Sequence, residues 1–216
     1  MNTIELENVS KTLRNNEVLK DITLHFESGK IYGFVGRNGS GKTMLFRIIA
    51  GLIKPTSGYV RYNSKVLGTE LDIIPRLGLV IENVGLYPEF TGLRNLKMLA
   101  NINCLIGEQE IKEAIIRVGL DPNDNRTVRK YSLGMKQRIV LAQAVMEHPD
   151  VLILDEPTNA LDEDGVEQIR ELIREEKERG ALVLIASHNK EDISSLCDKI
   201  YSMKAGACTE ILEDDE

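Results

Sequence analysis

Hydrophobic residues fall in two kinds of short run along the chain, and these predict two kinds of strand. In one kind apolar and polar residues alternate; in the other, nearly every residue is apolar, which is typical of strands buried in a parallel sheet. The predicted strands are Thr3–Asn8, Ile22–Phe26, Ile31–Val35, Tyr59–Tyr62, Leu77–Ile81, Val151–Leu154, Ala181–Ala186 and Lys199–Met203. We therefore predict an antiparallel amino-terminal layer beside a parallel sheet, with helices between the later strands.

The long segment from about Asn83 to Met146 lacks strand patterns and is predicted to be helical. Apolar residues recur at helical spacing at Ile111, Ile115 and Val118, and again at Val166, Ile169, Leu172 and Ile173. A length of 216 residues suits one compact domain. We therefore expect a single α/β domain over residues 1–216, with a core of about 1–82 and 149–216 and a helical subdomain of about 83–148.

A complete phosphate-binding loop pattern, G-x-x-x-x-G-K-[ST], follows the apolar run that ends at Val35. Its residues are Gly36, Arg37, Asn38, Gly39, Ser40, Gly41, Lys42 and Thr43. The glycines let successive backbone N–H groups point at phosphate oxygens, and the helix that follows adds the positive end of its dipole. Lys42 would supply charge to the β- and γ-phosphates, and the Thr43 hydroxyl would be a ligand of Mg²⁺. The loop predicts binding of a nucleoside triphosphate; a glycine-rich turn with an incidental lysine is the alternative.

Two carboxylates, Asp155 and Glu156, end the apolar run Val151–Leu154. Charge at the end of a buried strand is costly unless a cation or a reacting group lies beside it. Asp155 is expected to help hold Mg²⁺, which leaves Glu156 to orient or deprotonate the attacking water. The alternative, two acids that only cap the next helix, is weakened by the phosphate loop upstream.

Residues 131–138, Tyr-Ser-Leu-Gly-Met-Lys-Gln-Arg, open a helical pattern. They resemble the Leu-Ser-Gly-Gly-Gln signature of the nucleotide-binding subunits of ABC transporters, with Ser132 and Gly134 at matching positions. The Ser-Leu-Gly-Met form is similar to drug and peptide-antibiotic exporters of that family. Ser132 can cap the helix and, with the Gly134 backbone, present donors to a γ-phosphate, although alone it would be only an N-cap. The resemblance implies a P-loop NTPase of the ABC-cassette fold, with a RecA-like core, in which this phosphate belongs to ATP on a partner subunit.

Two further segments match the family in the expected order. Asn159-Ala160-Leu161-Asp162 resembles the D-loop, which contacts the opposite subunit, and Asp162 is also expected to cap the helix that follows. Ser187-His188 comes after a predicted strand and resembles the switch histidine that contacts the γ-phosphate. The resemblance therefore implies a catalytic role for His188 beside Glu156 and Lys42, whereas His25 and His148 have no such context.

Besides the signature substitutions Tyr131, Leu133 and Met135, the chain departs from the family at two further positions. Glu82 stands where the Q-loop has glutamine; its oxygen could still ligate Mg²⁺, and we expect it to couple the site to the membrane partner. A surface acid is the alternative. Where relatives stack the adenine on an aromatic ring, the chain has Thr12 and Leu13, and leucine lacks a π-surface, so base discrimination is expected to be weak. In the family, the surface after the Q-loop receives a helix of the membrane subunit, which makes Gly85–Pro88 and Phe90 candidates for that groove; ordinary loop packing explains them equally well.

Composition narrows the range of partners. A net charge of -7 and a pI of about 5.2 argue against a nucleic-acid partner. The basic cluster beside the signature is explained by solvation or by nearby phosphate; its members are Arg126, Arg129, Lys130, Lys136 and Arg138. Three cysteines without metal-ligand or redox spacing favour reduced thiols in the cytoplasm. No apolar segment is long enough to span a bilayer, so transport would need another chain.

These observations predict an ATP-hydrolysing subunit, with ATP and Mg²⁺ as its ligands, that dimerises head to tail. It would be cytoplasmic and would lie at the inner face of the membrane through a separate integral membrane permease. A homodimer is the simpler expectation, because one chain contains every motif, and export is favoured over import by the signature alone. A non-transport ABC ATPase that acts on ribosomes or chromosomes and a regulatory cassette without turnover are the two alternatives.

Overall fold

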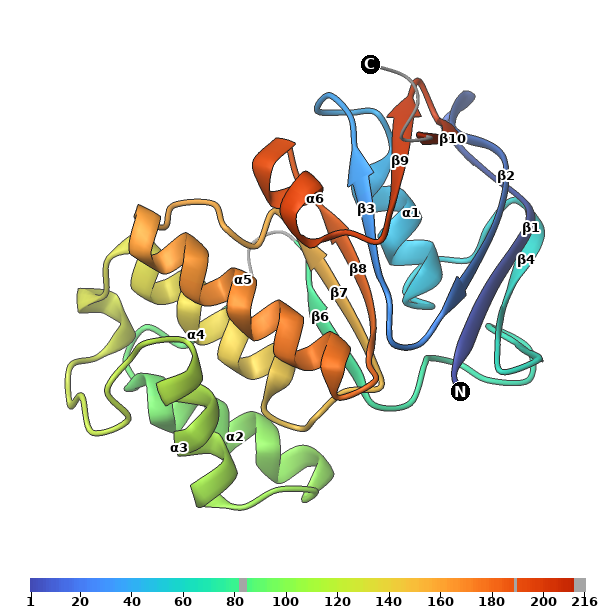
Figure 1. Ribbon diagram of the computed structural model, residues 1–216. Coiled ribbons are helices and arrows are strands. Elements are labelled where there is room, and N and C mark those ends of the chain that lie inside the picture. Colours follow the sequence, from blue (N-terminus) through green and yellow to red (C-terminus); the bar gives the residue numbers. More distant parts are fainter. Residues whose placement is uncertain (82–84, 189, 212–216) are drawn as a thin grey trace.

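The computed structural model describes residues 1–81, 85–188 and 190–211, and Figure 1 shows two sheets with helices between and beside them. A mostly parallel sheet has the strand order β10-β9-β3-β8-β7-β6. Its strands are β3 (Ile31–Val35), β6 (Leu77–Val80), β7 (Val151–Asp155), β8 (Leu182–Ala186), β9 (Lys199–Lys204) and β10 (Ala207–Ile211). Only β10 runs antiparallel to its neighbour among these strands. This arrangement confirms the predicted parallel sheet.

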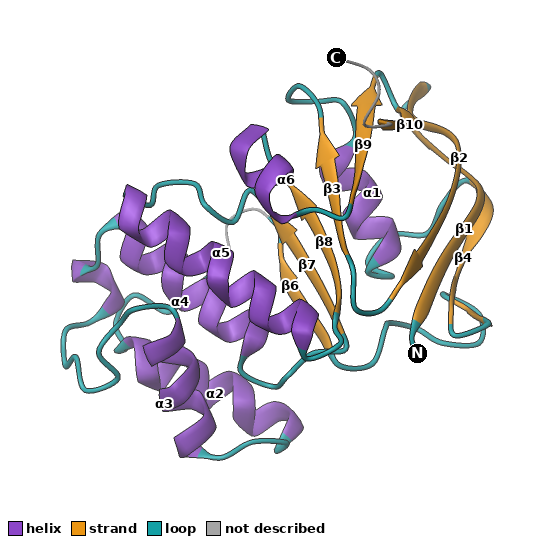
Figure 2. Cartoon of the chain, viewed as in Figure 1, coloured by secondary structure: helices purple, strands orange, loops and turns teal. Residues whose placement is uncertain are grey.

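An antiparallel sheet of order β2-β1-β4-β5 lies across from it (Figure 2). Its strands are β1 (Thr3–Leu13), β2 (Asn16–Glu27), β4 (Ser57–Tyr62) and β5 (Lys65–Val66). Both β1 and β2 are longer than predicted, because the pairing shifts register three times after Leu6 and Asn8 adopts a φ of 50°. Each bulge moves the following side chains to the other face, so the alternation that marks a strand is lost. The short strands β5 and β10 were not predicted.

Helix α1 (Lys42–Ile49) packs between the two sheets and shares a core with both. Helices α4 (Leu133–Val145), α5 (Glu163–Glu178) and α6 (Lys190–Leu196) cover the opposite face of the parallel sheet. Helices α2 (Gly92–Asn103) and α3 (Glu108–Arg117) pack against α4, and a 3-10 turn spans Val128–Lys130. Along β7, Val151 and Ile153 belong to the core that contains α1, and Leu152 and Leu154 belong to the core on the opposite face of the sheet. Strands covered on both faces are apolar throughout, which explains the uniform runs in the sequence.

The segment 85–148 is helical as predicted, and Ile111, Ile115 and Val118 are buried together. These side chains belong to the same hydrophobic cluster as Leu152 and Leu154 of β7. The division into a core and a helical subdomain therefore stays a prediction. No helix in the described ranges combines the length and the apolarity needed to cross a bilayer.

Candidate nucleotide site

The loop between β3 and α1 has no room for a side chain at two of its glycines. Gly41 is the N-cap of α1 with a φ of 109°, and a Cβ there would lie 2.9 Å from the Val18 carbonyl oxygen. A Cβ on Gly36 would lie 2.5 Å from the carbonyl oxygen of Met203. The turn after β9 also braces the loop, because the Gly206 N–H donates to the Ser40 carbonyl oxygen over 3.1 Å. The sequence thus folds into a loop held from two sides.

Lys42 and Thr43 begin α1 and point to different partners. The Lys42 ammonium is buried and donates to the Gly36 carbonyl oxygen over 2.7 Å, so it lies across the loop. The Thr43 hydroxyl donates to Asp155 Oδ2 over 2.5 Å. Parallel pairing in the order β3-β8-β7 brings the end of β7 beside the loop, since the carboxyl ends of parallel strands share one edge. The structure therefore brings together the lysine, the threonine and the first carboxylate.

Glu156 turns away from Asp155 through a left-handed backbone with a φ of 53°. Its N–H donates to the Ala186 carbonyl oxygen over 2.8 Å, which fixes the turn against the end of β8. Its Oε2 lies 2.7 Å from His188 Nδ1 and accepts a bond from the His188 N–H over 3.3 Å. A residue other than glycine in this conformation is strained, and such strain gathers at functional sites. The two consecutive carboxylates therefore have different partners and can do different chemistry.

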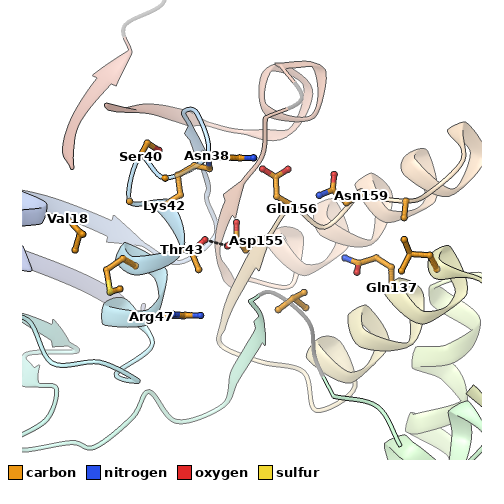
Figure 3. A pocket seen from close by; sticks show the side chains of 16 residues that line it. Val18, Asn38, Ser40, Lys42, Thr43, Arg47, Gln137, Asp155, Glu156 and Asn159 are labelled. Carbon is orange, nitrogen blue, oxygen red and sulfur yellow. Dashed lines mark hydrogen bonds between the residues drawn. The ribbon is translucent and has the colours of Figure 1, made fainter. Parts of the chain in front are cut away.

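A cavity of about 690 Å³ opens between these elements (Figure 3), a size usual for small-molecule sites. It is lined by Val18, residues 38–44, Arg47, Val80, Leu133, Gln137, Asp155, Glu156, Asn159 and Ala160. Gly36 and Arg37 line a second cavity of about 450 Å³ on the side of the loop that faces Ser202–Ala205. Most of the predicted loop residues therefore surround one cavity that the two carboxylates also reach.

The loop and its neighbours fit a nucleoside triphosphate with Mg²⁺. The Ser40 hydroxyl is buried and has no hydrogen-bond partner within the described ranges, an arrangement that costs about 1–3 kcal/mol. A phosphate oxygen, or the water around it, would satisfy that hydroxyl. The paired oxygens of Thr43 and Asp155 are hard ligands of the kind that Mg²⁺ takes together with substrate phosphates. Among the described residues, no three His, Cys, Asp or Glu side chains gather into a metal cluster.

The predicted signature residues lie at the amino terminus of α4. Ser132 is its N-cap, and the hydroxyl accepts a bond from the Met135 N–H over 3.1 Å. A Cβ on Gly134 would lie 2.8 Å from the Ala160 carbonyl oxygen, so this turn packs on the loop after β7. Asp162 caps α5 by accepting from the Gly165 N–H over 3.1 Å. Both capping predictions are confirmed.

Not all of the predicted residues in the described ranges line this cavity. Thr12 and Leu13 lie at the end of β1, and neither is among the residues that line it; contact of Leu13 with the base stays a prediction. Glu82 lies outside the described residues. Val18 of β2 lines the cavity instead, a residue that the sequence analysis did not find. Its place depends on the shifted register of β1 and β2, for which the residue pattern carries no signal.

The phosphate loop between a buried strand and a helix, with carboxylates at the edge of a parallel sheet, defines a P-loop NTPase. The chain belongs to the ABC transporter family, since the family model described as ABC transporter matches residues 19–159. It is an ATP-binding subunit of a transporter, and its enzyme class is ABC ATPase.

Relatives along most of the chain agree with this assignment. The chain is 46% identical over 203 residues to the uncharacterized ABC transporter ATP-binding protein YybJ of Bacillus subtilis, covering 94% of this chain and 93% of that protein. It is 36% identical to the bacitracin transport ATP-binding protein BcrA of Bacillus licheniformis, covering 96% of this chain and 68% of that protein. A dimeric, post-hydrolysis structure of the ATP-binding cassette MJ0796 with ADP and Pi matches with a TM-score of 0.86 and 25% identity, covering 96% and 97% of the two chains. The predicted fold class is confirmed by that match.

Proposed function

We propose that the chain hydrolyses ATP in a head-to-tail homodimer and thereby drives a separate membrane permease that exports its cargo. The observation that carries the proposal is the pairing of Thr43 with Asp155 and of Glu156 with His188, because Thr43, Asp155 and Glu156 all line one cavity. The first pair would hold the metal, and the second would provide a carboxylate base that the metal does not consume. Hydrolysis of a terminal phosphate by a positioned water needs both.

Each loop residue then has a defined task. The Lys42 ammonium would move from the Gly36 carbonyl to the β- and γ-phosphate oxygens, while the loop N–H groups surround the phosphates. Mg²⁺, when bound, neutralises charge that develops on the phosphate oxygens. The Glu156 carboxylate would accept the proton of the attacking water, and His188 would hold that carboxylate in place from the other side. Substrate orientation and proton removal thus come from separate side chains.

Exposure at the signature supports a dimer. Leu133 leaves 69% of its surface exposed although it follows the N-cap of a buried helix, and Ser132 beside it is exposed as well. The positive end of α4 therefore lies at the surface, where a γ-phosphate bound to a second subunit could reach it. The MJ0796 relative is itself a dimer, which agrees with this arrangement.

The candidate permease contact is the loop before α2. Tyr87 leaves 56% of its surface exposed, with its ring 5.8 Å from the Phe90 ring. The buried Asn95 amide fixes this loop by accepting from the Tyr87 N–H over 2.8 Å and donating to the Tyr87 carbonyl oxygen over 3.1 Å. A rigid loop that presents an aromatic ring suits insertion of a short helix from a partner. Such a contact would hold the chain on the cytoplasmic side of the membrane.

The name of the bacitracin transport relative supports a peptide antibiotic as the exported cargo. The two chains are 36% identical, so the proposal names a class of cargo and not one compound. ATP-dependent uptake of a labelled peptide antibiotic into inside-out vesicles would support export. Uptake into right-side-out cells that depends on this chain would instead indicate import.

Hydrolysis by the purified chain across a series of protein concentrations tests the ATPase proposal. We expect Mg²⁺-dependent turnover that rises more steeply than the protein concentration, as a dimer requires. Glu156→Gln should still bind ATP, lose turnover by a factor on the order of 10²–10⁴, and accumulate a closed dimer. Near-normal turnover in that variant would assign the base to another residue, and a linear dependence on concentration would argue against the dimer.

A pair of matched variants tests the permease contact. Tyr87 and Leu52 have equal exposed fractions of 56%, and Leu52 lies on the turn after α1, away from the candidate loop. Both Tyr87→Ala and Leu52→Ala should retain basal ATP hydrolysis, because neither touches the cavity. Only Tyr87→Ala should reduce recovery of the chain with membranes that contain the permease. Equal recovery of the two variants would move the contact elsewhere.

A further inference from the structure

Arg138, in the second turn of α4, places its guanidinium among three acceptors from α3 and α5. Nη1 donates to the Val118 carbonyl oxygen at the end of α3 over 2.8 Å and to Gln168 Oε1 of α5 over 2.6 Å. Nη2 lies 3.4 Å from Asp162 Oδ1, the oxygen that caps α5. The Arg138 side chain is only 14% exposed. The sequence analysis explained the basic cluster that contains Arg138 by solvation or by nearby phosphate, and the burial of Arg138 corrects the first of these explanations for this residue.

Two glycines leave the space that the guanidinium fills. A Cβ on Gly119 would lie 2.4 Å from Arg138 Nη1 and 2.1 Å from Gln168 Oε1. A Cβ on Gly165 would lie 2.5 Å from Arg138 Nη2. Neither position 119 nor position 165 has room for a side chain, so the space between them fits a planar guanidinium that carries several donors. Lysine has one rotating ammonium and cannot reach the same three acceptors together.

The same helix touches the loop between β7 and α5 at two more points. Gln137 Nε2 donates to the Pro157 carbonyl oxygen over 3.2 Å. Gly134 packs on the Ala160 carbonyl, because a Cβ at this position would lie only 2.8 Å from that oxygen. This loop begins at Glu156 and ends at Asp162, and three of its residues line the nucleotide cavity. The start of α4 therefore contacts the loop 156–162 at three points, and Arg138 contacts its last residue, Asp162.

We propose that Arg138 is a positioning residue that fixes the loop 156–162 to the amino terminus of α4. The groups offered to the partner's nucleotide, Ser132 and Gly134, then move together with Glu156 of the same subunit. This last step rests on the proposed function, because it needs a nucleotide shared between two subunits. The exposed pair with Asp162 adds little by itself. The bonds to Val118 and Gln168 hold the start of α5, to which the loop is joined at Asp162, against α3 and α4.

Hydrogen exchange on the free monomer tests the clamp without any nucleotide or dimer. Arg138→Met keeps most of the apolar stem and removes every donor. We expect the Gly165 and Val166 amides, which donate to Asp162, to exchange about tenfold faster, as the loss of charged hydrogen bonds implies. Amides of α1 should not change. Arg174→Met is the matched control, since Arg174 pairs only with Glu167 and Glu171 of its own helix among the bonds of the described residues.

Unchanged exchange at residues 156–166 in Arg138→Met, or an equal rise in Arg174→Met, would overturn the clamp. A uniform rise across the chain would also overturn it, because that result marks general destabilisation. Gly119→Ala places a methyl group against the Arg138 guanidinium and should raise the exchange rates of the same amides. Gly180→Ala is its control, because Gly180 has a φ of 97° against 76° at Gly119 but has no atom within 4 Å of its Cβ.

Kinetics and dimerisation test the consequence. In an otherwise unchanged chain, Arg138→Met should lower kcat about tenfold while KM for ATP stays within about twofold, since the loop that binds the phosphates is untouched. In the Glu156→Gln background it should reduce the closed dimer with ATP by a similar factor, and Arg138→Lys should recover only part of it. Equal changes in kcat and KM, or an unchanged amount of closed dimer, would overturn the proposal that Ser132 and Gly134 move together with Glu156. If Glu156→Gln alone forms no dimer while exchange responds as expected, the proposed dimer fails and the clamp stands.

Discussion

His188 Nδ1 lies 2.7 Å from Glu156 Oε2, so the histidine that follows β8 holds the carboxylate that follows β7. The imidazole leaves 64% of its surface exposed, whereas the carboxylate is mostly covered. The backbone N–H of His188 adds a second bond of 3.3 Å to the same oxygen. One carboxylate oxygen is thereby fixed in a residue that lines the cavity.

Removal of the imidazole should therefore affect turnover more than binding. We expect His188→Ala to lower kcat for ATP by a factor on the order of 10², the lower range for loss of a positioned proton-transfer partner. KM should change little, because Lys42 and the loop remain. Steady-state hydrolysis checks this, with His25→Ala as control, since His25 lies on β2 beside Glu5 and Glu27. A rise in KM with an unchanged kcat would show that His188 binds substrate without orienting Glu156.

The bond of 2.5 Å from the Thr43 hydroxyl to Asp155 predicts a defect specific to the metal. Thr43→Val keeps the shape of the side chain and removes the oxygen. We expect the Mg²⁺ concentration for half-maximal hydrolysis to rise about tenfold, as expected for the loss of one hydrogen bond to a charged group and of one ligand. Thr43→Ser, which keeps the hydroxyl, should behave almost as the unchanged chain does. Equal Mg²⁺ dependence in both variants would remove Thr43 from the metal site.

The phosphate loop and the two carboxylates could be predicted because their signals are local in the sequence. Glycine spacing fixes the loop, and an apolar run that stops at Asp155 marks the end of a strand. Val18 could not be predicted in the same way. It reaches the cavity through pairing of β1 with β2, and the register of that pairing shifts at bulges that the alternation does not reveal.

The sequence also contained no indication that some charged side chains are buried. Ile169, Leu172 and Ile173 predicted the buried face of α5, and Glu176 continues the same helical spacing. Its charged residue type gave no sign of burial, and the sequence analysis made no prediction for Glu176. Arg138 was misplaced for the same reason, since its partners come from α3 and α5 and lie far away in the sequence.

Glu176 predicts a large stability effect. It is fully buried, and Arg117 of α3 and Arg179 donate to its two oxygens over 2.7 Å each. Burial lowers the pKa of Arg117, but the bonds to Glu176 and Glu175 outweigh it and raise that pKa overall. Glu176→Ala would leave two guanidinium groups without their shared carboxylate and should cost about 3–5 kcal/mol of unfolding free energy.

Urea denaturation of matched variants measures this cost. Glu175 bonds the same Arg117 over 2.8 Å but is 49% exposed, so Glu175→Ala should cost less than about 1 kcal/mol. The midpoint should shift with an unchanged slope in both variants, because neither alters the area exposed on unfolding. Equal midpoints for the two variants would show that burial of the carboxylate does not determine the energy of this cluster.

Glu108 predicts how acid weakens the junction of α2 with α3. Hydrogen bonds from Lys112 and from Lys97 of α2 lower the pKa of its carboxyl from 4.5 to about 2. A folded-state pKa below the unfolded value means that the stabilisation is complete above pH 4.5 and is lost as the pH falls toward 2. The Tm of the unchanged chain should therefore exceed that of Glu108→Gln by a constant amount near neutral pH. The gap should narrow steadily below pH 4.5. Glu113→Gln is the control, because Glu113 accepts from the neutral Gln109 amide. A gap that widens in acid would reverse the sign of the linkage and exclude the lysine pairs as its source.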